Sequence, residues 1–444
     1  MSEGESARDP WNRLVALPIG TEVVITLPDG MTWRGWLLPS DPLSQPRVAH
    51  LKLSSGYNVG VFIHSDCQVE VLPGIPWGEP VQAFSTDERP SDGAEESPKG
   101  AVVIIATGGT IASRVDYVTG GVKPVRGKKA LETVYPGLTS GGPVVLREIF
   151  DILSEDVGPL HWTRIAQEAK SAFDHGARGI VVTHGTDTMA YTSSALAFQL
   201  RDLPGPVVLV GAQRSIDRPS SDGVTNLLSS MRIAREADLG EVVVAMHSGP
   251  SDNSVAIHRG TRVRKMHSTR RDAFHSTNEP PLGIMEKNVL QLSAHATRSG
   301  KPARLEEGFD EKGALLWIHP GLTEKVAVAH TEGARGIILA GTGMGHVPTS
   351  LLPWIKREVK GGTVVAMTTQ CLGGTVDPFV YSRGRELSAA GVLYLGDIFP
   401  ETAFVKLLWA LKHFSDAKQV GDAMVREIAG EFGRSRPLDV GGKP

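Results

Sequence analysis

The sequence predicts an α/β protein with two parallel-sheet subdomains, preceded by a small N-terminal β-barrel. Three observations lead to this prediction. Residues 20–72 alternate apolar and polar side chains around turn signals, residues 74–98 are rich in Pro, Ser, Gly and Glu, and short apolar runs alternate with helical patterns from residue 101 onwards. A chain of 444 residues is long enough for several domains.

The barrel is predicted to occupy residues 1–73. Alternation in GTEVVITLPDGMTWRGWLL (residues 20–38) is interrupted by the turn signal PDG, and SSGYNVGVFI (residues 54–63) carries a second glycine-containing turn. About five short strands suffice for an SH3-like or OB-like barrel, and periodicity does not choose between them. Residues 74–98 bury too little apolar surface to offset their ordering entropy, so we predict a linker there.

Continuous apolar runs predict buried parallel strands in residues 99–284. Helical spacing of Ile165, Ala169 and Phe173 predicts a helix that ends at Gly176 in a left-handed conformation. Ser221 or Asp222 is predicted to cap a second helix. The apolar runs are AVVIIA (101–106), GIVVTHG (179–185), PVVLVGA (206–212) and EVVVAMHSG (241–249).

A second series of the same kind predicts another α/β subdomain in residues 313–444. PETAFVKLLWALKHF (400–414) is predicted to be one of its helices, and residues 285–312 lack a clear pattern and are predicted to connect the two subdomains. The apolar runs of this series are ALLWIHPG (314–321), GIILAGTG (336–343), TVVAMTTQ (363–370) and VLYLGDI (392–398).

Composition narrows the classes of function. A net charge of −3 lacks the basic excess of a dedicated nucleic-acid binder. Cys67 and Cys371 fall in different predicted domains, which argues against a disulfide framework and fits a reducing compartment. The N-terminus has no apolar segment typical of a signal peptide, and no apolar run approaches the ~18 residues of a membrane helix. We therefore expect a cytoplasmic protein without membrane contact.

Polar clusters follow two predicted strands, where open parallel sheets bind their ligands. IIATGGTIAS (104–113) places Gly109 and Thr110 after the first strand, and THGTDTM (183–189) places Thr186 and Asp187 after the second. Glycines allow close backbone approach. A hydroxyl becomes a nucleophile beside a base or a cation, which a Thr, Asp and Lys set could supply. Lys265, in RGTRVRKMHSTRRDAFHS (259–276), is the candidate third member.

Other interpretations of these segments stay open. Thr186 or Asp187 could cap the following helix, and the basic cluster of Arg262, Arg264, Lys265, Arg270 and Arg271 could be a solvated loop or a nucleic-acid patch. GTGMGH (341–346) lacks the full dinucleotide-binding spacing, and ATGGTIAS lacks the Lys of a phosphate-binding loop. His267 and His275 are interpreted as loop residues, so no metal site is predicted.

ATGGTIAS together with THGTDTM resembles the L-asparaginase family, over roughly residues 99–435. Four further stretches are similar to the D subunits of archaeal-type Glu-tRNA(Gln) amidotransferases within that family. They are LKLSSGYNVGV, HRGTRVRKMHSTRRDAF, TTQCLGGTVDPFVYSRGREL and PETAFVKLLWAL. The resemblance implies an asparaginase-like fold and a glutaminase, that is, an amidohydrolase subunit of an amidotransferase.

The resemblance also implies roles for individual residues. Thr110 would attack the side-chain amide of glutamine, release ammonia and leave a Thr acyl-enzyme. Lys265 would lower the cost of deprotonating Thr186, and Asp187 would orient the set and hold the substrate ammonium. Tyr117 matches a tyrosine near the nucleophile, and the matches to substrate-binding residues are Gly109, Ser154 and Glu155.

A partner is implied in the same way. An E subunit would bind tRNA(Gln), activate the tRNA-linked glutamate with ATP and Mg²⁺, and use the ammonia to make Gln-tRNA(Gln), while this chain would need no cofactor. A homodimer would join two partners in a two-plus-two heterotetramer. The alternative is a free-standing L-asparaginase or glutaminase, because asparagine and glutamine differ by one methylene, which is worth only ~1–3 kcal/mol in a binding pocket.

Overall fold

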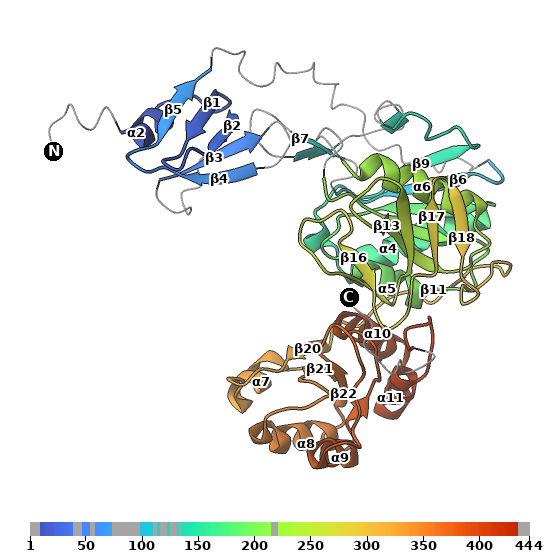
Figure 1. Cartoon of the computed structure of the whole chain (residues 1–444). Helices are drawn as coiled ribbons and strands as arrows, with labels where there is room; N and C mark the ends of the chain where they lie inside the picture. The colour runs from blue at the N-terminus through green and yellow to red at the C-terminus, as the bar shows by residue number, and fades with distance from the viewer. Residues whose placement is uncertain are drawn as a thin grey trace. The chain divides into compact units, whose positions relative to one another are not determined.

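Figure 1 shows the computed structural model of the chain, which forms two compact units. The first comprises residues 1–94, 112–126 and 214–221, and the second comprises residues 95–111, 127–213 and 222–444. The structure describes residues 9–38, 47–53, 58–72, 98–109, 113–115, 122–124, 131–132, 135–214 and 221–433. Within these residues no helix is long and apolar enough to cross a membrane. The linker predicted at residues 74–98 lies outside the described residues except for Pro98.

The first unit contains a five-stranded antiparallel sheet in the order β4-β3-β2-β1-β5. Alternate side chains of β1, Val23 and Ile25, are buried against Leu51 of β3 and Leu14 of helix α2 (Pro10–Val15). The strands are β1 (Glu22–Thr26), β2 (Thr32–Leu37), β3 (Val48–Leu53), β4 (Asn58–Phe62) and β5 (Gln68–Val71), and a separate hairpin joins β7 (Ser113–Val115) to β8 (Val122–Pro124).

This sheet confirms the small antiparallel β unit expected at the N-terminus. Gly30, in the predicted PDG turn between β1 and β2, has a φ of +86°, which glycine adopts without strain. Within the described residues, β4 does not pair with β5. Closure into an SH3-like or OB-like barrel therefore stays a prediction.

The second unit is built on an eight-stranded sheet in the order β18-β17-β14-β13-β12-β10-β6-β9. The strands from β9 to β13 are parallel, and every side chain of β6, β10 and β12 is buried, which explains their uninterrupted apolar sequences. The predicted strands are thus confirmed. The parallel strands are β6 (Val102–Ala106), β9 (Val144–Glu148), β10 (Gly179–Thr183), β12 (Val207–Val210) and β13 (Val242–His247).

Helices cover both faces of this sheet. Helices α4 (Pro159–Asp174) and α5 (Met189–Gln199) share one core cluster with alternate side chains of β6, β10 and β12. Helix α6 (Gly223–Glu236) packs against β10, β12 and β13 without contributing to that cluster, so it covers the opposite face. Gly176 follows α4 with a φ of +85°, as predicted.

The predicted cap of α6 is only half correct. Asp222 occupies the N-cap position, but its side chain makes no capping hydrogen bond. Its carboxylate instead accepts hydrogen bonds from the Gln213 N–H (2.9 Å) and from Asn226 Nδ2 (3.1 Å). Ser221 donates its hydroxyl to the Arg214 carbonyl instead. The carboxylate therefore joins the end of β12 to the first turn of α6.

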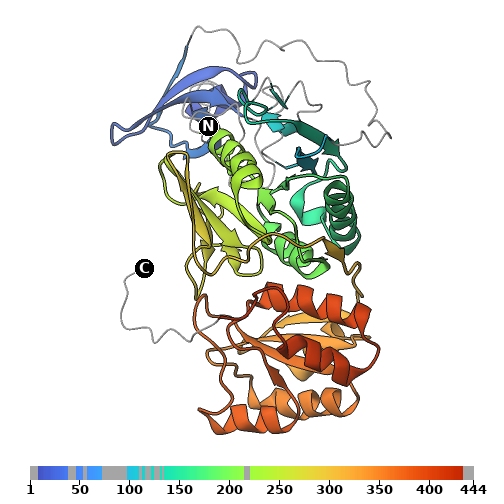
Figure 2. The same ribbon diagram turned by 90° about the vertical axis from the view of Figure 1, so that its right-hand side faces the viewer.

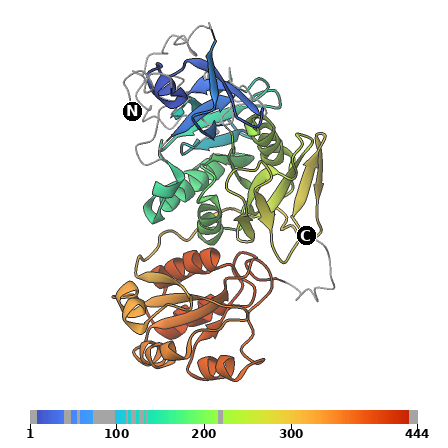
Figure 3. The same cartoon turned by 60° about the vertical axis from the view of Figure 1, so that its left-hand side comes forward.

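Antiparallel strands, which the apolar runs did not indicate, extend the large sheet at one edge (Figure 3). Residues 285–312, predicted to be a patternless connector, include the end of β17, all of β18 and strand β19, which pairs with β11. Their period-2 patterns are too short to be recognised. The strands that extend the large sheet are β14 (Ser254–Arg259), β17 (Gly283–Glu286) and β18 (Val289–Leu292), and the separate pair is β11 (Leu200–Arg201) and β19 (Arg304–Leu305).

A four-stranded parallel sheet in the order β20-β21-β22-β23 confirms the second predicted series (Figure 2). Helix α10 packs on this sheet and on α5, where Phe198 stacks on Trp409 with 6.3 Å between ring centroids. The elements are β20 (Gly313–Trp317), β21 (Gly336–Gly341), β22 (Val364–Thr369), β23 (Leu393–Tyr394), α7 (Glu324–His330), α8 (Leu352–Lys360), α9 (Ser382–Ala389), α10 (Pro400–His413) and α11 (Ala417–Val425).

A fully buried ion pair fastens the segment after α11 to α10. The side chains of Lys406 and Glu431 are both 0% exposed, and their charged groups are 2.5 Å apart. Lys406 also donates to the carbonyls of Met424 and Arg426, and the Glu431 carboxylate accepts the Ile428 and Ala429 N–H groups. Such bonding offsets the large cost of removing both charges from water.

We expect Lys406→Met to lower the free energy of unfolding by about 3–5 kcal/mol, because Glu431 would be left buried without its cation. Guanidinium denaturation of the full chain, followed by tryptophan fluorescence, measures this change. Lys356→Met, which breaks the exposed pair with Glu386, is the matched control and should cost less than about 1 kcal/mol. Equal destabilisation by the two variants would contradict the prediction.

Candidate active site

Glycines bring the ends of β6 and β10 into direct backbone contact. Gly108 and Gly109 have φ values of +104° and +85°. A Cβ on Gly108 would lie 2.6 Å from the Ile152 carbonyl oxygen, and one on Gly109 would lie 2.5 Å from the Gly185 nitrogen. Only glycine fits both positions. The sequence suggested that these glycines allow close backbone approach, and in the structure they approach the backbone of Ile152 and Gly185.

Three of the predicted site residues meet beside this contact. Lys265 Nζ donates to Thr186 Oγ1 and to Asp187 Oδ1, each at 2.8 Å. The Lys265 side chain is 12% exposed, whereas that of Asp187 is 70% exposed. The N-cap of α5 is Thr188, and no side chain caps that helix. The alternative in which Thr186 or Asp187 caps α5 is thus wrong, because Lys265 engages both side chains.

The strand that carries Lys265 is anchored by the second sheet subdomain. Lys265 ends β15 (Val263–Lys265), which pairs only with β16 (Phe274–Ser276) among the described strands. Arg262, 3% exposed, donates to Asp397 Oδ2 (2.7 Å) and to the Glu431 carbonyl (2.8 Å). Arg264 pairs with Glu401 at 2.9 Å, and burial raises the pKa of Glu401. Residues far along the chain therefore set the position of Lys265.

The basic cluster around Lys265 is neutralised internally. Each of its cationic side chains contacts a carboxylate: Arg262 with Asp397, Arg264 with Glu401, Lys265 with Asp187, Arg270 with Asp272 and Arg271 with Asp252. A surface that binds nucleic-acid phosphates needs cations free to replace counterions. The structure therefore favours a structural interpretation of this segment over a nucleic-acid patch.

Ser154 and Glu155 lie in the 3₁₀ turn η2 (Ser154–Asp156), next to the end of β10. Ser154 is buried, and a Cβ on Gly185 would lie 2.7 Å from Ser154 Cβ. Thr188 Oγ1 donates to the Ser154 carbonyl, and Ser154 Oγ lies 3.4 Å from Glu155 Oε2. Glu155 itself is exposed. Ser154 thus stands close to Gly185, which precedes Thr186, and Glu155 is the next residue in the chain.

Two of the predicted residues, Thr110 and Tyr117, lie outside the described residues. Gly109, which precedes Thr110 in the chain, is described and lies against the Gly185 backbone.

A buried histidine that sequence reasoning overlooked lies beneath the site. His184 is 0% exposed, and burial lowers its pKa to about 4. Its Nδ1 is 2.6 Å from the Gly185 carbonyl oxygen, and its Nε2 is 2.9 Å from Thr192 Oγ1, to which Trp162 Nε1 donates at 3.1 Å. The signal was present, because His184 stands within the THGTDTM motif.

A second buried histidine, also not predicted, connects the end of β13 to the segment that follows Lys265. His247 Nδ1 is 2.6 Å from Asn226 Oδ1, and its Nε2 is 3.1 Å from Asp252 Oδ1. Arg271 pairs with the same Asp252. This chain of polar contacts helps to order the residues between β15 and β16.

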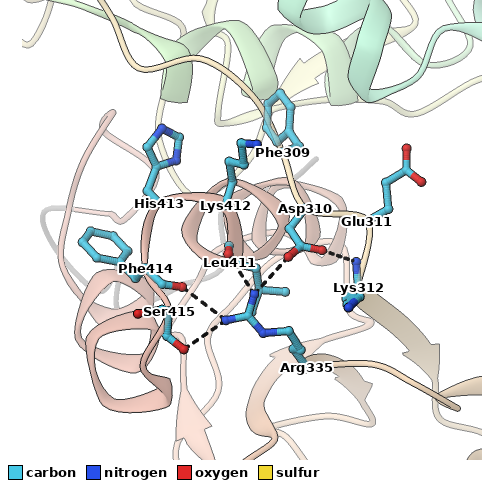
Figure 4. A pocket seen from close by; sticks show the side chains of 10 residues that line it. All are labelled: Phe309, Asp310, Glu311, Lys312, Arg335, Leu411, Lys412, His413, Phe414 and Ser415. Carbon is cyan, nitrogen blue, oxygen red and sulfur yellow. Dashed lines mark hydrogen bonds and ion pairs between the residues drawn. The ribbon is translucent and has the colours of Figure 1, made fainter.

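One cavity lies away from these residues. It has a volume of about 770 Å³ and opens at the C-terminal end of α10, around Arg335 (Figure 4). Arg335 donates to Asp310 and to the carbonyls of Leu411, Phe414 and Ser415. None of the predicted site residues lines the cavity. The Arg335 guanidinium donates to carbonyl groups at the C-terminal end of α10, as basic side chains there commonly do. We therefore place no chemistry in this cavity.

Metal ligands are not clustered in the part of the chain that the structure describes, where no three His, Cys, Asp or Glu residues could hold an ion together. His267 Nδ1 accepts the Thr269 and Arg270 N–H groups, as expected of a loop histidine. The chemistry that the site geometry offers is instead that of hydroxyl, carboxylate and ammonium groups.

Three family models match the chain. Residues 17–72 match the GatD N-terminal domain, residues 101–298 match the N-terminal asparaginase domain, and residues 314–424 match the glutaminase/asparaginase C-terminal domain. These matches and the two sheets confirm the expected asparaginase-like α/β fold, preceded by a small β-rich domain.

Two relatives match nearly the whole chain. It is 42% identical over 415 residues to the D subunit of the glutamyl-tRNA(Gln) amidotransferase of Saccharolobus solfataricus, covering 92% of this chain and 91% of the relative. The D subunit of the Pyrococcus abyssi enzyme is 42% identical over 406 residues, with coverage of 90% and 91%.

Solved structures are similar over the α/β part. The thermostable L-asparaginase of Thermococcus kodakarensis has a TM-score of 0.68 and 34% identity, and covers 76% of this chain and 100% of its own. L-asparaginase I of Vibrio cholerae has a TM-score of 0.65 and 28% identity, with the same coverage.

The low pKa of His184 predicts that acid destabilises the fold. Its pKa is about 4 in the folded protein and about 6.5 when unfolded, so the unfolded chain binds the proton first as the pH falls. The stability that neutral His184 contributes is fully present above pH ~6.5 and is lost towards pH ~4. The free energy of unfolding changes with a slope of up to ~1.4 kcal/mol per pH unit in this range. Calorimetric unfolding between pH 7 and 4 should show a shallower slope in His184→Asn. An unchanged slope in this variant would refute the prediction.

Proposed function

Because this chain belongs to the family of Glu-tRNA(Gln) amidotransferase D subunits, we propose that it is the ammonia-generating glutaminase of such an amidotransferase. It is an amidohydrolase subunit with an asparaginase-like body. The substrate would be glutamine, whose side-chain amide is hydrolysed to glutamate and ammonia. The ammonia would then pass to a partner subunit that amidates Glu-tRNA(Gln).

The observation that carries this proposal is the contact of Lys265 Nζ with Thr186 Oγ1 at 2.8 Å, with Asp187 on the same ammonium. A neighbouring cation stabilises the alkoxide form of a hydroxyl and so makes proton transfer through Thr186 less costly. Asp187 keeps the ammonium in place. Because its side chain is 70% exposed, its carboxylate is also open to the α-ammonium of a substrate.

The reaction proposed for this site has two steps. Thr110 Oγ attacks the carbonyl carbon of the glutamine side-chain amide and gives up its proton, the leaving nitrogen gains a proton, and the C–N bond breaks with release of ammonia. Water then attacks the resulting ester, so glutamate is released and the Thr110 hydroxyl is restored. Covalent catalysis of this kind replaces one difficult step by two easier ones.

Both steps pass through a tetrahedral oxyanion. Backbone N–H groups near Gly109 and Thr186 are the proposed donors, and removal of one such donor typically costs ~10² to 10³ in rate. The backbone contact between Gly109 and Gly185 supports this assignment, because it brings the two strand ends together. Ser154, Glu155 and Gly109 would hold the substrate's charged groups, and Tyr117 would lie near the nucleophile.

The partner in this proposal is the E subunit. It would bind tRNA(Gln) and activate the tRNA-linked glutamate with ATP and Mg²⁺, whereas this chain would act without a cofactor. We propose a homodimer of this chain within a two-plus-two heterotetramer in the cytoplasm. The match of residues 17–72 to the GatD N-terminal domain supports an amidotransferase subunit over a free-standing enzyme, because the similar L-asparaginases cover only 76% of the chain.

A free-standing L-asparaginase or glutaminase is the second candidate. The 34% identity to the L-asparaginase of Thermococcus kodakarensis favours it, since the same fold acts there on asparagine. The chemistry would be the same, and only the fate of the ammonia would differ.

Valine matches the shape of threonine but lacks its hydroxyl. We expect Thr110→Val and Thr186→Val each to lower kcat for ammonia release from glutamine by at least ~10³, whereas Thr186→Ser should retain measurable activity. Coupled-enzyme detection of ammonia gives kcat. Cys371→Ser, at an exposed thiol, serves as a control and should keep wild-type activity. Near-normal turnover in either valine variant would rule out that residue's assigned role.

Ammonia release with and without the partner separates the two candidate functions. For an amidotransferase subunit, glutamine hydrolysis should rise several-fold when the E subunit, ATP and Glu-tRNA(Gln) are added, because ammonia production is then coupled to its use. Full turnover of asparagine by the chain alone, without any rise on addition of the partner, would favour the free-standing enzyme instead.

A further inference from the structure

We infer that His184 is a positioning residue of this site, holding the Gly185–Thr186 peptide so that the Thr186 N–H faces the reacting amide. This inference rests on the proposed function, because it concerns the same amide-cleaving site. His184 itself does not touch the reacting atoms. It acts through the backbone of the residues that follow it.

The hydrogen bonds around His184 determine its tautomer. Trp162 Nε1 can only donate, so Thr192 Oγ1 accepts from it at 3.1 Å. The Thr192 hydroxyl can then donate to His184 Nε2, 2.9 Å away. At the other side of the ring, the Gly185 carbonyl can only accept, so Nδ1 must carry the proton across 2.6 Å. Every member of this chain therefore has its donor direction set by its neighbours.

Burial keeps this tautomer neutral. His184 and Thr192 are 0% exposed and Trp162 is 5% exposed, so water does not compete for these groups. A protonated ring would turn Nε2 into a donor and place it opposite the Thr192 hydroxyl, which would have to reverse. The low pKa of His184 agrees with this arrangement.

Because the peptide bond is planar, the orientation of the Gly185 carbonyl determines the orientation of the Thr186 N–H. In a trans peptide the C=O and the following N–H point in opposite directions. The Gly185 carbonyl is held by His184, so the Thr186 N–H points away from that ring. Within the described residues no backbone carbonyl accepts from this N–H. The hydroxyl of the same residue accepts a hydrogen bond from the Lys265 ammonium. The peptide thus offers a donor beside the contact of Lys265 with Thr186.

Close packing on the other sides leaves the peptide little freedom. A Cβ on Gly211 would lie 2.8 Å from both the His184 carbonyl oxygen and Thr186 Cγ2. Gly185 is likewise pressed between Gly109 and Ser154. The backbone cannot accept a side chain at these points, so the orientation of one peptide is decided by the hydrogen bond from His184.

Matched substitutions in the full chain, with its partner subunit, test this inference. Thr192→Val removes the hydroxyl that donates to Nε2 while keeping the shape, and we expect kcat for glutamine hydrolysis to fall about tenfold with KM within twofold. Thr192→Ser retains the hydroxyl and should keep wild-type kcat. Equal kcat in these two variants would overturn the inference.

Substitution of the histidine gives a second comparison. Asparagine can place its amide N–H where Nδ1–H stands, so His184→Asn should keep kcat within about fivefold. His184→Leu has a similar volume without a donor and should lose about a hundredfold. Leu and Asn variants of equal activity would overturn the inference. Should His184→Leu fail to fold, as judged by circular dichroism, the Thr192 pair decides the result.

Nitrogen NMR of ¹⁵N-histidine-labelled protein reads the tautomer independently of activity. Wild type should show His184 as the neutral Nδ1–H form at pH 7, and Thr192→Val should shift the Nε2 resonance, because that nitrogen loses the hydroxyl that donates to it. A wild-type ring that is Nε2–H or protonated would overturn the inference. An inactive wild-type complex would overturn the proposed function and the inference together, whereas an active one with insensitive variants would overturn the inference alone.

Discussion

The contact between the Lys265 ammonium and the Thr186 hydroxyl is the interaction on which the proposed chemistry depends. Lysine is strongly hydrated, and placing it 12% exposed at 2.8 Å from a neutral hydroxyl is unfavourable unless a carboxylate shares the site. Asp187 supplies that carboxylate. The lysine side chain reaches Thr186 from β15, which is not a strand of the large sheet. A separate strand, β15, therefore has to be held in position by other parts of the fold.

That support comes from residues close to the end of the chain. Arg262 and Arg264, on both sides of Val263, pair with Asp397 and Glu401 in the second sheet subdomain. The Glu431 carbonyl accepts from Arg262, while its carboxylate is buried against Lys406. Arg262, which is buried, would be costly without its partners, so the two subdomains constrain one another. The site is thus supported by ion pairs that bind no substrate in the proposed mechanism.

Sequence patterns identified the parallel strands because those strands are buried on both faces, which leaves uninterrupted apolar runs such as VVIIA in β6. The antiparallel edge was missed because β17 and β18 have only four residues each. Lys265 was a candidate third member of the Thr and Asp set from its chemistry, and the family resemblance assigned it to Thr186, 79 residues away, since no local pattern encodes that pairing. The role of His184 required the positions of Trp162 and Thr192, which lie on two different helices.

The anchoring of β15 has a consequence for biosynthesis. A ribosome releases the N-terminal part of the chain first, and Lys265 emerges well before Asp397, Glu401 and Glu431. Until those late residues have been translated, Arg262 can pair only with early residues such as Glu279, Arg264 lacks Glu401, and β15 is supported by β16 without the second subdomain. Under the proposed function, a nascent chain would therefore hydrolyse glutamine poorly until Asp397, Glu401 and Glu431 have been added.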